Sequence, residues 1–241
     1  MRKFLLLLML LLPVAVSASV EIELLSADVD LHDKVSLRRG AKHFVNYCLG
    51  CHSAKYIRYL RIARDFGLEN DTVLKDIAPL GASIYDTMNS AMDAHDAAKW
   101  FGTMPPDLSL IARSRGPDWL YTYLKGFYVD EKRPFGVNNW VFQDVGMPHI
   151  LWQLQGLQRP VYKSMPHGGT PMIEKLELIE PGTLSPKEFD QVVNDLVNFL
   201  VYVGEPTQME RRSLGKYVLL FIIMFGVVAY LLKREYWKDV H

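Results

Sequence analysis

The pattern of apolar and polar positions begins with a short apolar run at the N-terminus. Arg2 and Lys3 precede nine apolar residues, Phe4–Leu12, and a stretch that resembles a small-residue cleavage site follows at positions 16–18. A basic start, an apolar run too short to span a membrane easily and such a site are typical of a secretory signal peptide. We therefore predict that residues 1–18 are a cleaved signal and that the following domain is exported, with an uncleaved anchor as the alternative.

A second apolar run lies near the C-terminus. Residues 217–232 carry no charge and are flanked by Lys216, Lys233 and Arg234, with Tyr236 and Trp237 beyond. A helix of this length spans about 24 Å of a hydrocarbon core about 30 Å thick, so flanking residues must enter the membrane too. We predict one transmembrane anchor at 211–234 and a cytoplasmic tail at 235–241; a buried soluble helix is the alternative. Basic residues balance across the anchor, so the signal peptide sets the orientation.

Between the two runs, apolar residues recur at helical spacing. The first such stretch runs from Asp33 to Cys48, and either Asp33 or Ser36 can cap a helix there. It predicts that Cys48 lies at the end of an amphipathic helix. Two shorter stretches, introduced by proline, aspartate or serine, predict helices at 105–115 and 118–124.

The strongest helix signal of this domain begins at residues 185–188, Ser-Pro-Lys-Glu. The segment combines an N-cap, a proline at the first helical position and a capping-box glutamate, and the apolar pattern continues to Gly204. Residues 125–181 differ, because they are rich in glycine, proline and aromatics, and predict a long loop region with at most short elements. A large flat cofactor would account for such a loop. The predicted fold is mostly α, with long irregular loops and one C-terminal transmembrane helix.

Composition and charge narrow the class of protein. The 241 residues are 49% hydrophobic and 22% charged, which fits one globular domain plus membrane segments. The formal net charge is zero, but the exported domain, residues 19–210, holds 19 Lys and Arg against 25 Asp and Glu, a net charge of −6. Nucleic acid is therefore not an expected partner. A basic protein partner fits this charge better.

The motif Cys48-Leu49-Gly50-Cys51-His52 carries the chemistry. Two thiols at this spacing can add to the two vinyl groups of a haem, and the adjacent histidine can then ligate the iron. We predict one covalently attached haem c, bound through Cys48 and Cys51 and ligated by His52. The domain is thus expected to be a cytochrome c-type haem domain.

Two cysteines at this spacing have three other possible uses. A structural disulfide rarely spans a two-residue gap, and a thioredoxin-like redox pair belongs to a βαβ context that the helical surroundings do not offer. A zinc site would need further ligands, and the chain has no other cysteine. The two cysteines followed directly by a histidine are specific enough to favour haem attachment over these three uses.

The opposite side of the iron needs a second ligand, and the sequence ranks its candidates weakly. They are Met88, Met92, Met104, Met147, Met165, Met172, Met209, His43, His95, His149 and His167. Met147 lies in the loop-rich segment before Pro148, where a rigid proline can present a sulfur without helical constraint. Met104, which precedes Pro105, is the close competitor.

Several motifs together resemble the cytochrome c1 family. They are Ser36-Leu37-Arg38-Arg39-Gly40 before the cysteine motif, Met104-Pro105-Pro106-Asp107-Leu108-Ser109 with Arg113 and Arg115, Val145-Gly146-Met147-Pro148, Glu205-Pro206 and the C-terminal anchor. The resemblance implies that Met147 is the sixth ligand, that Met104 packs beside the haem, and that Arg115 contacts a haem propionate. Relatives carry an aromatic shortly after this arginine, and it is Trp119 here.

The resemblance also implies a role and partners. The chain would be the electron-transfer haem subunit of a quinol:cytochrome c oxidoreductase (bc1), a translocase, with no turnover of its own. Its partners would be cytochrome b, a Rieske iron–sulfur donor, a soluble or tethered cytochrome c acceptor and membrane lipid. The domain would lie on the periplasmic side of a bacterial inner membrane. The alternative is an independent membrane-tethered cytochrome c that feeds a terminal oxidase or reductase.

Overall fold

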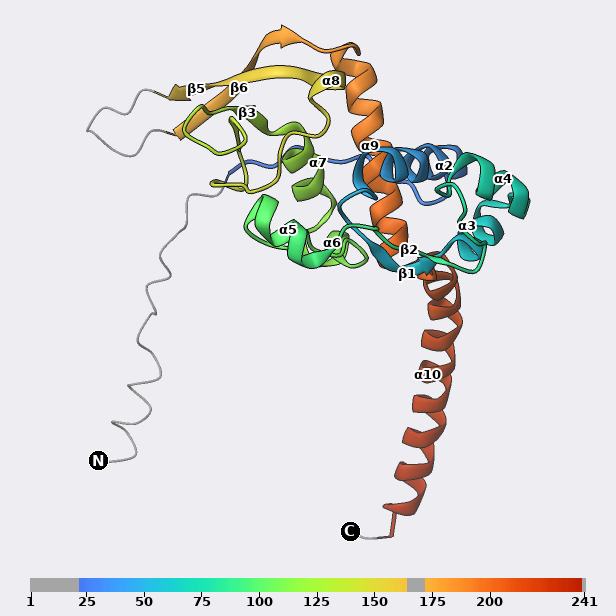
Figure 1. The fold of residues 1–241 in the computed structure, drawn as a ribbon. Coiled ribbons are helices and arrows are strands. Elements are labelled where there is room, and N and C mark those ends of the chain that lie inside the picture. The colour runs from blue at the N-terminus through green and yellow to red at the C-terminus, as the bar shows by residue number, and fades with distance from the viewer. Residues whose placement is uncertain (1–21, 164–171, 240–241) are drawn as a thin grey trace, which may run out of the picture.

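The computed structural model describes residues 22–163 and 172–239 (Figure 1). The predicted signal peptide lies outside these residues, and so do Met165 and His167. The helices are α2 Lys34–His43, α3 Tyr59–Phe66, α4 Asn70–Asp76, α5 Ala94–Phe101, α6 Ile111–Arg115, α7 Pro117–Lys125, α8 Trp152–Gln155, α9 Pro186–Gly204 and α10 Gln208–Tyr236, with a π-helical turn, η1, at Phe44–Cys48. The strands are β1 Ala54–Arg58, β2 Thr87–Met88, β3 Phe127–Val129, β4 Val137–Asn139, β5 Gly156–Lys163 and β6 Met172–Pro181. The described part of the chain is thus mostly helical, as predicted.

Helix α9 runs through the centre of the domain, and α2 crosses it (Figure 1). The predicted capping box is present, because the Ser185 N–H donates to a Glu188 carboxylate oxygen at 2.8 Å and Ser185 Oγ accepts from the Glu188 N–H. Asp33 caps α2 by accepting from the Val35 and Ser36 N–H groups. Both helices confirm the sequence prediction, and α2 continues through η1 to Cys48.

The crossing of α2 and α9 is tight and contains a buried charge. Ser36 Oγ donates to the Asp195 carboxylate at 2.7 Å, and Arg39 donates to both of its oxygens, at 2.6 and 2.9 Å. The Asp195 side chain is only 1% exposed, so these bonds offset the cost of burying its charge. Gly40 makes the approach possible, since a Cβ there would lie 2.0 Å from the Asp195 carbonyl oxygen.

We expect Gly40→Ala to destabilise the domain by about 1–3 kcal/mol or more, the usual cost of overpacking. The added methyl meets backbone and the Cβ of Phe199, neither of which can move aside without shifting a helix. Thermal unfolding of the purified protein measures the loss. Val35→Ala, at an exposed position of the same helix, is the control and should change stability far less. Equal melting temperatures for the two variants would contradict the tight crossing.

Two sequence predictions were wrong in part. Residues 105–110 are not helical, because Leu108 donates its N–H to the Ser53 carbonyl at 2.7 Å, and Asp107 accepts from the Ser109 and Lys55 N–H groups. The segment 125–181 is not a simple loop, because β5 and β6 form a long antiparallel hairpin from Gly156↔Pro181 to Lys163↔Met172. Each strand of a two-stranded hairpin is an edge strand, which tolerates Pro160 within β5.

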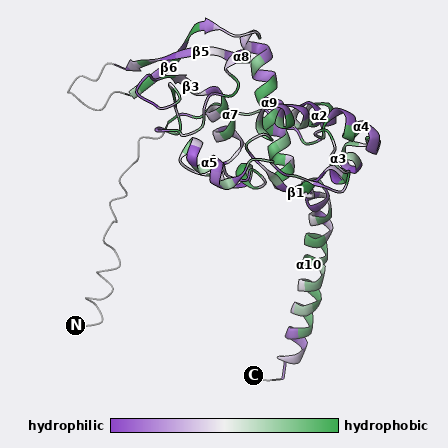
Figure 2. Ribbon diagram, in the orientation of Figure 1, coloured by the Kyte–Doolittle hydropathy of each residue, from purple (hydrophilic) through white to green (hydrophobic). Residues whose placement is uncertain are grey.

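Helix α10 projects from the end of the domain opposite the hairpin and is apolar along most of its length (Figure 2). It holds an 18-residue window of mean hydropathy 2.2, none of which is buried. The helix extends the predicted anchor at 211–234 by a few residues at each end. Only Glu205–Thr207 separates it from α9, and the Glu205 carboxylate pairs with Arg211 at 2.5 Å and lies 3.9 Å from the Arg113 guanidinium.

Candidate haem site

One open cavity of about 370 Å³ brings the predicted site residues together. Cys48, Cys51, His52, Arg115 and Met147, which the sequence places in three separate segments, all line it. The rest of the wall is mainly apolar and includes Phe101, Ile111, Trp119, Leu120, Phe142, Val145, Leu196 and Leu200. A large apolar cavity with a few polar atoms is the usual form of a cofactor site.

The cysteine motif forms a tight turn at the end of η1. Both Cys51 and His52 donate their N–H groups to the Cys48 carbonyl, at 3.0 and 2.8 Å. Both cysteines are free and partly buried, so the disulfide alternative is wrong for this structure. Burial, with a smaller contribution from Cys51, raises the pKa of the Cys48 thiol to about 12. The Cys48 thiol is therefore held in its neutral form, and both cysteines lie at the wall of the same cavity.

The imidazole of His52 is oriented by the backbone of another segment. Its Nδ1 lies 2.7 Å from the Pro106 carbonyl oxygen, which can only accept, so Nδ1 carries the proton. Nε2 then keeps its lone pair, which is the arrangement of histidines that ligate metals. Burial lowers the pKa of His52, although the Pro106 carbonyl and Asp107 oppose this effect. The ring therefore favours the neutral form that a ligand requires.

Met147 is the one candidate for the second ligand that the described residues place at the cavity. Its Sδ accepts a hydrogen bond from the Tyr123 hydroxyl at 3.4 Å. Met104 is 38% exposed and does not line the cavity, although its neighbours Thr103 and Pro105 do. Met88 is fully buried elsewhere in the core, and His149 is buried beside Phe127, with their rings stacked at 4.9 Å.

Arg115 ends α6 at the rim of the cavity. Its guanidinium carbon lies 4.9 Å from the centre of the Trp119 ring and 6.0 Å from that of Phe142. Within the described residues, no carboxylate forms an ion pair with it. A cation held over aromatic rings without an acidic partner suits an acidic group of a ligand.

Comparison with known proteins decides the family. The model of the cytochrome C1 family matches residues 26–240. The chain belongs to the cytochrome c1 family. The cytochrome c1 of Allochromatium vinosum is 53% identical over 90% of both chains, and a Nitrosomonas europaea protein named ammonia monooxygenase gamma subunit is 48% identical over 91% of this chain and 90% of its own. A chain of a solved hyperthermophilic respiratory complex III aligns with all of this chain and 96% of its own at 15% identity, with a TM-score of 0.41 that is too low to compare folds.

As a member of the cytochrome c1 family, the chain is a haem-bearing electron-transfer subunit of the bc1 complex, which is an oxidoreductase. The family implies haem c and association with cytochrome b and a Rieske protein. It does not favour the alternative of an independent tethered cytochrome. Together with α10, it supports a membrane-anchored protein.

Sequence reasoning missed several residues of this cytochrome c1 site. Pro106 orients His52 through its carbonyl, which no side-chain pattern reveals. Tyr123 lies on the inner face of α7, and Leu196 and Leu200 reach the cavity from α9. The four-residue spacing of Trp119 and Tyr123 is the available signal, since it places the two side chains on one side of successive turns of α7.

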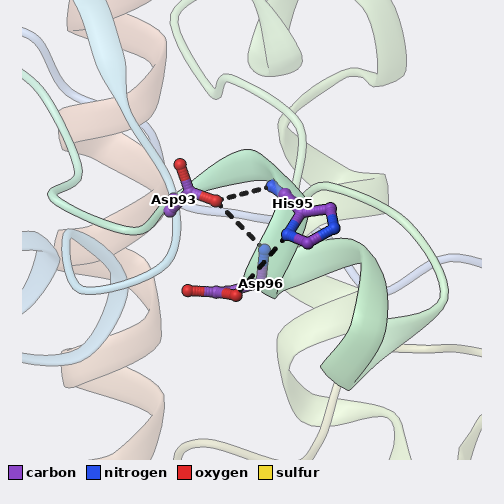
Figure 3. Close-up of side chains that lie close together, drawn as sticks. All are labelled: Asp93, His95 and Asp96. Atoms are coloured by element: carbon purple, nitrogen blue, oxygen red, sulfur yellow. Dashed lines mark hydrogen bonds and ion pairs between the residues drawn. The ribbon is translucent and has the colours of Figure 1, made fainter.

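A second group of polar side chains, Asp93, His95 and Asp96, lies close together at the start of α5 (Figure 3). Asp93 is the N-cap of α5, and its carboxylate accepts from the N–H groups of His95 and Asp96 at 2.8 and 3.1 Å. None of the three lines the cavity. Helix capping accounts for their proximity, and Asp93 and His95 are exposed.

Proposed function

We propose that the protein binds one haem c covalently through Cys48 and Cys51, ligates the iron with His52 and Met147, and passes electrons from a Rieske protein to a cytochrome c. One observation carries this proposal. The two thiols, a neutral imidazole with a free Nε2 and a thioether share one apolar cavity. These four side chains would be sufficient to attach one haem and to provide two ligands for its iron.

The chemistry of these donors suits the group. An imidazole nitrogen and a thioether sulfur are the axial ligands of electron-transfer haems, and the bound haem would supply one-electron exchange at a potential that the thioether raises. The chain's own residues set the conditions for it. The Pro106 carbonyl fixes the His52 ring, and the apolar wall would limit the access of water to the bound group. If both ligands stay bound in the two oxidation states, the coordination of the iron would change little when an electron is gained or lost.

Arg115 would contribute electrostatics at the rim. We assign it to a haem propionate, because its guanidinium has no acidic partner among the described residues and faces aromatic rings instead. A charge-assisted hydrogen bond there would hold the group and stabilise its acidic edge. Trp119 supports Arg115 by stacking against its guanidinium. The indole has no hydroxyl, so Trp119 could not take the place of Arg115 through a hydroxyl hydrogen bond to the propionate.

The anchor would hold this domain on the periplasmic side of a bacterial inner membrane. Tyr236 and Trp237 are exposed at the end of α10, where aromatic residues favour the membrane interface. The exposed apolar surface of α10 would contact lipid and cytochrome b. Quinol binding and proton translocation would belong to partner subunits, so this chain would have no independent turnover.

Gentle solubilisation tests the role as a whole. Cytochrome b and a Rieske protein should co-purify with the chain, and a reduced-minus-oxidised spectrum should show a c-type α band. Quinol should reduce the haem that gives this band only when the Rieske protein is present. A band that quinol reduces without the Rieske protein, or a chain that purifies with a terminal oxidase instead, would contradict the proposal.

We expect acceptor docking to depend on salt. The domain carries a net charge of −6, and Glu174, Glu177 and Glu180 gather on β6. Reoxidation of the reduced haem by a basic cytochrome c should slow at least about tenfold between low and high ionic strength, because screening removes electrostatic steering. Stopped-flow oxidation at several salt concentrations measures this.

The same β strand offers a control for this prediction. Glu177 already pairs with Arg159 at 2.9 Å, so Glu177→Gln should change the salt slope less than Glu174→Gln combined with Glu180→Gln. A wild-type rate that is indifferent to ionic strength would exclude steering by the acidic domain. Equal slopes for wild type and the double variant would exclude these two glutamates.

A further inference from the structure

Three side chains form a stacked column along one wall of the cavity. The Arg115 guanidinium lies over the Trp119 ring at 4.9 Å, and the Trp119 ring stacks on the Tyr123 ring at 4.9 Å with an angle of 13° between their planes. Trp119 and Tyr123 are four residues apart and lie on successive turns of α7, while Arg115 is the last residue of α6, just before the break at Gly116. The column leads from the rim of the cavity to the sulfur of Met147.

The Tyr123 ring is held on its other sides as well. Phe127 meets it edge-on at 5.3 Å, and Phe142 does so at 6.5 Å. This packing leaves the ring little freedom to turn away, which fixes the position of its hydroxyl. A phenol hydroxyl carries a proton that it can donate in a hydrogen bond.

The acceptor is the sulfur that would ligate the iron. The Tyr123 hydroxyl donates to Met147 Sδ at 3.4 Å. A thioether sulfur has two lone pairs, so it can accept this hydrogen bond with one and donate the other to a metal. The same bond therefore also selects which lone pair faces the cavity.

We propose that Tyr123 is a positioning residue that orients the Met147 sulfur and raises the reduction potential of the haem through this hydrogen bond. The inference rests on the proposed ligation by Met147. A donated hydrogen bond draws electron density from the sulfur, so the sulfur donates less to the iron. Weaker donation destabilises the ferric state more than the ferrous state, which favours reduction.

The test is Tyr123→Phe in the intact complex, with Tyr121→Phe as the matched control. Phenylalanine keeps the ring and its stacking and removes only the hydroxyl. Tyr121 lies on the same helix, but its hydroxyl meets Lys125 at 3.2 Å and does not face the cavity. Both variants lose one hydroxyl, so the control accounts for general effects on stability.

We expect Tyr123→Phe to keep the covalent haem and the near-infrared sulfur-to-iron band of the ferric protein. Its equilibrium constant for one-electron reduction should fall roughly two- to tenfold, which is the net contribution of one hydrogen bond. A tenfold fall is about 59 mV in a redox titration. The control should titrate like the wild type.

Failure of this inference is distinguishable from failure of the ligand assignment. If the sulfur-to-iron band depends on Met147 but Tyr123→Phe and Tyr121→Phe have the same potential as the wild type, Tyr123 has no such role. A potential that rises in Tyr123→Phe would also overturn it. If the band survives replacement of Met147, the ligation is wrong, whatever Tyr123 does.

Discussion

Replacing Met147 with leucine should lower the midpoint potential of the haem by roughly a few hundred millivolts, out of the range of about 0.8 V that axial ligands control. The haem should stay attached, since Cys48 and Cys51 are unchanged. Leucine fills a similar volume but cannot ligate iron, so the sulfur-to-iron absorption band should vanish. Redox titration and near-infrared spectra of the ferric protein measure both effects, and reduction by a Rieske donor should become inefficient.

Met104→Leu is the matched control, because it makes the same change in a methionine that also precedes a proline. Its side chain is 38% exposed and outside the cavity, so we expect a loss of stability under about 1.5 kcal/mol and a nearly unchanged potential. A band that persists in Met147→Leu and disappears in Met104→Leu would reverse the assignment. Of these two methionines, the structure places only Met147 at the cavity.

Removal of either motif cysteine should abolish stable holoprotein. Cys51→Ala and Cys48→Ala each remove one covalent link to the haem. Because core residues of α9 line the cavity that the haem should fill, loss of the haem would leave part of the core unfilled. Apoprotein with an apolar cavity of this kind should unfold and be degraded. Haem staining of a denaturing gel, with immunodetection of the chain, measures attachment and abundance together.

Ser90→Ala provides the control for the cysteine variants. The Ser90 hydroxyl donates to the Gly50 carbonyl inside the motif at 2.9 Å, so this variant disturbs the motif but keeps both thiols. It should stain as strongly as the wild type. Unchanged covalent haem in Cys51→Ala would show that the attachment was assigned to the wrong residues.

The sequence predicted those parts of the structure whose signals are local. The capping box at Ser185, the cap at Asp33 and the uncharged run in α10 each act within a few residues, and the corresponding helices formed as expected. The cysteine motif is equally local. The five predicted site residues also meet in one cavity, although their meeting followed from a family resemblance rather than from spacing alone.

The parts that escaped prediction depend on contacts between distant segments. Residues 105–110 follow a helical pattern, but the bond from Leu108 to the Ser53 carbonyl holds them beside the cysteine motif. Neither strand of the hairpin has a regularly buried face, because almost all of their residues are half-buried or exposed, so their alternation is weak. The bond between Tyr123 and Met147 joins two segments 24 residues apart, and no local rule connects them.

A short corner, Glu205–Thr207, connects α9, which lines the cavity, to α10, the predicted membrane anchor. Leu196 and Leu200 of α9 belong to the cavity wall, and α10 begins only three residues after α9 ends, with Glu205 paired to Arg211 across the corner. A transmembrane helix adjusts its tilt to the thickness of the bilayer around it. Because the corner is only three residues long, we expect a change in the tilt of α10 to shift α9 and the cavity wall that it forms. In a thicker or thinner bilayer, the haem site would then face its redox partners at a different height and angle.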